Sequence, residues 1–195
     1  MTLNFAQLAS AVRVLDGAWG TELQKRCLPA GHATELWNIE NPDAVEAVAD
    51  GSEVSLTNTF GANRFVLERH GLGERVAQLA RAGVAISRRA AGRAGALVFA
   101  AIGPTGKIVM TGEVSPDELT AAFAQTARAL ADAGADALIL ESFAELEEIE
   151  LALQAVKSAC SLPDAKRDGH IARAIGPDGP GQRRRRRRGQ LRRGA

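Results

Sequence analysis

The sequence predicts an α/β fold in which four strand–helix units form a parallel sheet. Short apolar runs alternate with longer helical stretches, and each apolar run ends in small or polar residues. Strands that are buried on both faces appear as continuous apolar runs, and helical crossovers between them imply parallel pairing. Four such units fit either a small doubly wound sheet or half of an eightfold barrel.

The four strands are predicted from apolar runs that meet turn residues. They are expected at residues 12–16, 53–57, 96–102 and 136–140. The first ends in Asp-Gly and the third in Gly-Pro, both of which favour a turn. Ligands of α/β folds bind at the carboxyl ends of the strands, so the residues after each run are the candidate site.

The helices are predicted between and after these strands. They are expected at residues 41–50, 73–93, 115–133 and 146–159. The third has the clearest start, because Pro116 stands at its first position and Asp117 and Glu118 place negative charge in its first turn. Gly134 follows as its stop signal.

Charge is divided unevenly along the chain. Residues 164–195 carry 11 Lys/Arg and 3 Asp/Glu, a net charge of +8 within a chain total of +1. Residues 1–163 therefore carry −7. The tail is rich in Gly, Pro and Arg, with six consecutive arginines at 183–188, and it shows no helix or strand period. We expect a folded part, residues 1–163, and a disordered basic tail, residues 164–195.

Several classes of protein are excluded by composition. Hydrophobic residues make up 46% of the 195 residues, as in a globular protein. No run of about 18 apolar residues predicts a membrane span, and the first ten residues do not resemble a secretory signal. We therefore expect a cytoplasmic protein. Cys27 and Cys160 are isolated and the three histidines are scattered, so the sequence predicts no metal ligands.

Five segments resemble the homocysteine S-methyltransferase family. They are residues 15–23 (LDGAWGTEL), 35–43 (ELWN followed by NPD), 56–64 (LTNTFGANR), 102–106 (IGPTG) and 140–143 (LESF). Their order and spacing match the family pattern over about residues 12–163, which is more specific than any one segment alone. The family fold is a (βα)8 TIM barrel, so the resemblance implies a partial barrel, about its first four βα units.

The resemblance also implies a substrate site. Asp16 and Glu141 would hold the amino group of homocysteine, since two acids can grip one ammonium through charge-assisted hydrogen bonds. Gly17 would let the backbone approach the substrate. The same rim would be lined by Thr57, Asn58 and Thr59. Turn-forming or structural roles are the alternative for each of these residues.

The family chemistry is methyl transfer to the homocysteine thiol, which gives methionine. Zinc in the family presents the thiol as a thiolate, the true nucleophile. The three zinc cysteines follow the sixth and eighth strands, which this chain does not match, and Cys27 and Cys160 are not at those positions. We therefore assign no catalytic residue and expect a truncated, inactive form. The methyl donor stays open among methyltetrahydrofolate through cobalamin, betaine and S-methylmethionine.

The tail permits an unusual explanation. One allowed choice of codons for residues 183–192 reads, one base later, as Gly-Ala-Asp-Val-Val-Gly-Ala-Asn-Cys, which resembles the family's sixth strand and first zinc cysteine. Residues 170–174 permit a similar match in the same shifted frame. We hypothesise that residues from about 164 onward are out-of-frame translation.

Two other functions stay open from the sequence. The chain could be an amino-acid-binding module without catalysis, or a nucleic-acid-binding protein with a basic tail. The tail has no interleaved aromatic residues, which argues against nucleic acid. Unpaired barrel edges would favour self-association.

Overall fold

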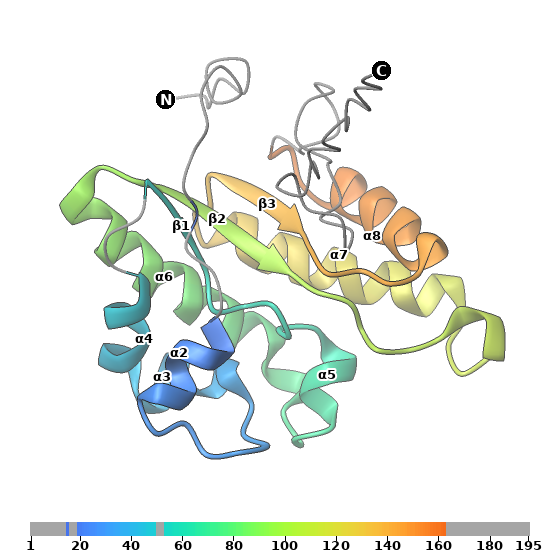
Figure 1. Cartoon of the computed structure of the whole chain (residues 1–195). Helices are drawn as coiled ribbons and strands as arrows, with labels where there is room; N and C mark the ends of the chain where they lie inside the picture. Colours follow the sequence, from blue (N-terminus) through green and yellow to red (C-terminus); the bar gives the residue numbers. More distant parts are fainter. Residues whose placement is uncertain (1–14, 16–18, 50–52, 163–195) are drawn as a thin grey trace, which may run out of the picture.

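The computed structural model describes residues 15, 19–49 and 53–162 (Figure 1). Its centre is a parallel sheet in the order β1-β2-β3, formed by β1 (Val54–Leu56), β2 (Leu97–Ile102) and β3 (Ala137–Leu140). Three predicted strands are therefore confirmed, the first of them shorter than expected. Of the strand predicted at 12–16, only Leu15 lies in the described part, where it forms an isolated parallel bridge with Val54.

Ten helical segments accompany the sheet in the described residues. In chain order they are α2 (Trp19–Lys25), η1 (Thr34–Leu36), α3 (Trp37–Glu40), α4 (Pro42–Ala49), α5 (Arg64–Glu68), η2 (Gly73–Arg75), α6 (Val76–Ala94), η3 (Val109–Thr111), α7 (Pro116–Asp132) and α8 (Leu146–Ala159). The four predicted helices are confirmed as α4, α6, α7 and α8, and the short ones were not predicted. Within the described residues, no helix has the length and apolarity needed to cross a bilayer.

The main core lies between the sheet and the three long helices α6, α7 and α8 (Figure 1). Side chains alternate across each strand, so Ala100 and Leu138 face these helices. Phe123 of α7 is fully buried among them. The opposite side of the strands carries a smaller cluster of Val54, Leu56, Phe99 and Ala137, packed against Trp19 of α2.

Helix α7 begins at the predicted residue because its start is capped in both directions. The Ser115 hydroxyl accepts from the Glu118 backbone N–H at 3.2 Å, and the Glu118 carboxylate accepts from the Ser115 N–H at 2.9 Å. Pro116 takes the first helical position, where no donor is needed. The backbone hydrogen bond from Ser115 is the main reason why the pKa of Glu118 is lowered.

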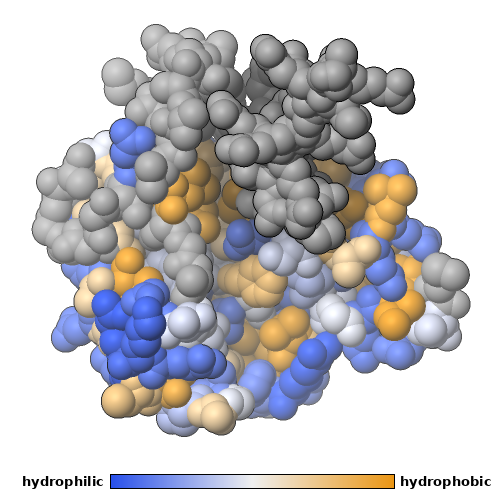
Figure 2. Space-filling model, in the orientation of Figure 1, coloured by the Kyte–Doolittle hydropathy of each residue, from blue (hydrophilic) through white to orange (hydrophobic). Residues whose placement is uncertain are grey.

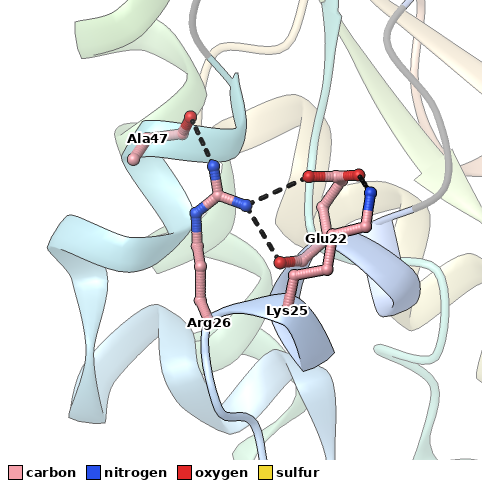
Figure 3. A network of polar contacts seen from close by, with 4 residues as sticks. All are labelled: Glu22, Lys25, Arg26 and Ala47. Atoms are coloured by element: carbon pink, nitrogen blue, oxygen red, sulfur yellow. Dashed lines mark hydrogen bonds and ion pairs between the residues drawn. The ribbon is translucent and has the colours of Figure 1, made fainter.

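Helix α2 is fastened to α4 by a small charged network (Figure 3). The Arg26 guanidinium donates to the Glu22 carbonyl at 2.9 Å, to the Glu22 carboxylate at 3.1 Å and to the Ala47 carbonyl at 3.5 Å. Lys25 donates to the other Glu22 oxygen at 2.6 Å. Hydrogen bonds from Lys25 and then Arg26 lower the pKa of Glu22. The network links the end of the helix that follows the predicted Asp16–Gly17 turn to α4.

Candidate functional site

The candidate site lies where the carboxyl ends of the three strands meet, at the edge toward which the arrowheads of β2 and β3 point in Figure 1. Two backbone bonds continue the pairing beyond the strands. Gly103 N–H donates to the Phe60 carbonyl at 2.8 Å, and Glu141 N–H donates to the Ile102 carbonyl at 3.2 Å. The segments after β1, β2 and β3 therefore lie next to one another.

Glu141 is the acidic residue at this edge that the sequence singled out. Burial of its side chain raises the pKa of the carboxyl. Within the described residues, no cation lies at ion-pair distance from it, although a half-buried carboxylate is stabilised by one. A ligand ammonium could supply the missing positive charge.

The residue directly after Glu141 has an unusual backbone conformation. Ser142 has a φ of +62°, in the left-handed region that favours glycine. Such a conformation in a residue with a side chain costs about 1 kcal/mol or more and is concentrated at functional sites. Strand β3 ends at Leu140, and this conformation follows two residues later, directly after Glu141.

Thr57 and Thr59 form a closed hydrogen-bond ring with the end of β2. Ala101 N–H donates to the Thr57 hydroxyl at 3.1 Å, and the two hydroxyl oxygens lie 2.5 Å apart. The Thr59 hydroxyl donates to the Ala101 carbonyl at 2.8 Å. Both side chains are buried, so the ring replaces strand pairing where β1 has ended.

The Asn58 side chain is directed into the protein interior. Its amide donates to the Thr34 carbonyl at 2.7 Å and to the Asn38 amide oxygen at 2.9 Å. The Asn38 amide in turn donates to the Asn58 carbonyl at 2.8 Å and to the Leu79 carbonyl at 3.1 Å. The side chains of residues 57–59 are thus engaged within the protein, and their contact with a ligand stays a prediction.

Two buried glutamates hold the neighbouring loops, a role that the sequence did not reveal. Glu35 accepts from Gly61 N–H at 2.6 Å, below the loop that follows β1. Glu148 of α8 accepts from the Thr105 N–H at 2.7 Å and from its hydroxyl at 2.6 Å, and so fixes the loop after β2. Glu35 lies inside one of the family-like segments, and Glu148 lies shortly after another. This position was the signal in the sequence that could have pointed to both residues.

Two predicted site residues, Asp16 and Gly17, lie outside the described residues, as does the whole basic tail, so what was expected of them stays a prediction. Among the residues that the structure describes, no three His, Cys, Asp or Glu are grouped so that they could hold a metal ion. Cys27 follows α2 and Cys160 follows α8, both as free thiols. The described donor set does not fit a zinc site.

Comparison with known sequences gives one consistent family. A family model described as homocysteine S-methyltransferase matches residues 13–171. Methionine synthase of Mycobacterium tuberculosis (strain ATCC 25618 / H37Rv) is 30% identical over 162 residues, which is 75% of this chain and 14% of that protein. Methionine synthase of Mycobacterium leprae (strain TN) is 28% identical, over 75% of this chain and 13% of that protein. The chain thus spans about a seventh of the length of these curated relatives.

Comparison with solved structures agrees on the fold. The metallated form of the homocysteine methyltransferase MmuM from Escherichia coli superposes with a TM-score of 0.68 and 23% identity, over 82% of this chain and 64% of that chain. Its apo form gives a TM-score of 0.59 and 24% identity, over 78% and 57% respectively. The parallel sheet and its helices are therefore similar to a TIM-barrel-type homocysteine methyltransferase.

Proposed function

We propose, because the chain belongs to the homocysteine S-methyltransferase family, that residues 1–163 provide the part of such an enzyme that holds the amino group of homocysteine. The observation that carries this proposal is Glu141, a half-buried carboxylate at the carboxyl edge of the sheet with no cation beside it among the described residues. The family reaction is methyl transfer to the homocysteine thiol, which forms methionine, and the expected compartment is the cytoplasm.

Glu141 acts here as an acceptor for the substrate ammonium. Its ionised carboxylate would take a charge-assisted hydrogen bond in a partly dehydrated setting, where such a bond is stronger than in water. Asp16 would supply a second carboxylate and Gly17 an unobstructed stretch of backbone. The hydrogen bonds of Thr57 and Thr59, together with those of Glu35 and Glu148, hold this edge of the sheet in one conformation. Ligand binding therefore does not have to order it.

Zinc would make the homocysteine thiol nucleophilic in this family. The chain carries only two cysteines, and its described residues do not fit a zinc site. We therefore expect the 195-residue chain to bind homocysteine without transferring a methyl group to it.

The four βα units form, on this proposal, one half of an eightfold barrel. The sequential order β1-β2-β3, the helical crossovers and the likeness to MmuM support it. Residues from about 164 are proposed to be out-of-frame translation. Sequencing the gene through this region tests that idea: a shifted frame without the Gly-Ala-Asn-Cys segment would refute it.

Calorimetric titration with L-homocysteine tests the binding proposal. The full chain should bind, and Glu141→Gln should weaken binding about tenfold or more, because a neutral amide cannot balance the ammonium charge. Glu147→Gln is the matched control, since Glu147 is exposed in the first turn of α8. Equal affinities of the two variants would overturn the role of Glu141.

A further inference from the structure

Phe60 is an exposed aromatic residue within a buried segment. Every residue from 54 to 63 is buried except Phe60, which is 40% exposed. Figure 2 shows hydrophobic residues set among hydrophilic ones on the face of the molecule that it draws, and scattered exposed apolar side chains are ordinary in proteins. Phe60 differs from them in how firmly the surrounding structure holds it.

The backbone on both sides of Phe60 is fixed. Thr59 is bonded to β2 through its hydroxyl, and Gly61 N–H is bonded to the buried carboxylate of Glu35. The Phe60 carbonyl itself accepts from Gly103 N–H at 2.8 Å, and Ala62 N–H closes a turn onto the Thr59 carbonyl at 3.0 Å. A loop with this many internal bonds presents its exposed side chain in one place.

Gly103 makes room for the ring. A Cβ atom at this position would lie 2.5 Å from two carbon atoms of the Phe60 ring and 2.7 Å from a third, closer than real Cβ contacts. The ring therefore packs against the backbone of Gly103, at the end of β2. Part of the ring remains open to solvent at the carboxyl edge of the sheet.

Phe60 and Glu141 belong to segments that flank the end of the same strand, β2. The Phe60 carbonyl accepts from Gly103 N–H, and Glu141 N–H donates to the Ile102 carbonyl. Ile102 and Gly103 are consecutive residues at the end of β2. A small amino acid whose ammonium meets Glu141 would have its side chain at this edge. The exposed part of the Phe60 ring offers apolar surface at this edge.

We propose that Phe60 is a specificity-determining residue whose ring packs against the sulfur-bearing chain of the amino acid bound at Glu141. The inference rests on the proposed function and adds how the site would distinguish a ligand with sulfur from the same ligand with oxygen. Sulfur makes favourable contacts with aromatic rings, whereas a hydroxyl placed on a ring loses water without gaining an equal partner. Homocysteine should therefore bind more tightly than homoserine, which differs only in having oxygen in place of sulfur.

Competing titrations of the full chain measure this selectivity. Under reducing conditions, we expect L-homocysteine to bind about two- to twelvefold more tightly than L-homoserine. Phe60→Ala should abolish the preference and leave the homoserine affinity within about twofold. Phe60→Leu should also abolish the preference for homocysteine, because leucine is apolar and of similar size but has no aromatic ring. Ile39→Ala is the control, since Ile39 is exposed to a similar degree, 38%, on α3.

Gly103→Ala tests the geometry with the ring still present. The added methyl group must displace the Phe60 ring from its position against residue 103, so the preference for homocysteine over homoserine should fall as in Phe60→Ala. Thermal unfolding of each variant establishes that it is folded under the titration conditions.

The outcomes separate the two proposals. If the wild type binds both amino acids and the variants at residues 60 and 103 keep its preference, the role of Phe60 is wrong and the proposed function stands. An equal loss of affinity for both ligands would also overturn selectivity by the ring. If the wild type binds neither ligand, the proposed function fails and this inference falls with it.

Discussion

Glu141 is half-buried, directly precedes a residue with a positive φ and, among the described residues, has no neighbouring cation. Desolvation raises the pKa of its carboxyl above the ordinary glutamate value of 4.5. The protonated form cannot pair with an ammonium, so binding requires that Glu141 be ionised. The ligand's own charge would favour the ionised form and lower the pKa again in the complex.

Homocysteine affinity is therefore expected to fall as pH is lowered. The loss begins at the raised pKa of free Glu141, above 4.5, and grows as more of the carboxyl becomes protonated. The ligand ammonium stays charged throughout this range. Calorimetry from neutral pH downward measures the effect, and Glu141→Gln should show no such decline. Parallel curves for wild type and variant would contradict the assignment.

Glu148 shows at the same scale how a buried acid can be structural. Replacing it with alanine leaves the N–H and hydroxyl of Thr105 without their acceptor, which should destabilise the fold by about 2–3 kcal/mol. Glu148→Gln should cost less, because its amide oxygen can still accept. Urea unfolding measures both, with the exposed Glu147→Ala as control. A Glu148→Ala variant as stable as that control would refute the anchoring role.

At the scale of elements, capping decides where α7 begins. Ser115→Ala removes one half of the capping box and should destabilise the fold by about 1 kcal/mol. The exposed Ser161, which lies outside any helix, provides the control as Ser161→Ala. Urea unfolding of the two variants compares them, and equal stabilities would show that the cap does not matter.

Long elements were predictable from the sequence, whereas short ones were not. Helices α6, α7 and α8 and strand β2 have enough length for their apolar period to show. Helix α5 spans five residues and depends on Asn63, whose side chain accepts from the N–H groups of residues 65 and 66. Local period could not reveal it, although an asparagine at this position is a known capping signal.

The candidate site was predictable only in part. The sequence placed Glu141 and residues 57–59 at strand ends, and the parallel sheet brings those ends to one edge. It could not show that the side chains of 57–59 turn inward, because a loop has no period that fixes direction. The exposure of Phe60 was hidden for the same reason, since it depends on Gly103, 43 positions away in the chain.

At the scale of the whole molecule, the important feature is how the two edges of the sheet are paired. In the described part of the chain, β3 pairs only with β2, and the other edge is formed by the single bridge of Leu15. Unpaired strand edges favour association with another chain. We expect an apparent mass that rises with concentration in sedimentation equilibrium. A constant monomer mass up to high concentration would contradict this.

The most direct test of the account is the ionisation of Glu141 with and without homocysteine. Carbon-13 NMR of the glutamate carboxyls, with Glu141 assigned by its loss in Glu141→Gln, follows this group alone. We predict a titration midpoint above the ordinary glutamate value in the free protein and a clearly lower midpoint at saturating L-homocysteine. An unchanged midpoint in the presence of the ligand would show that Glu141 does not hold the substrate ammonium.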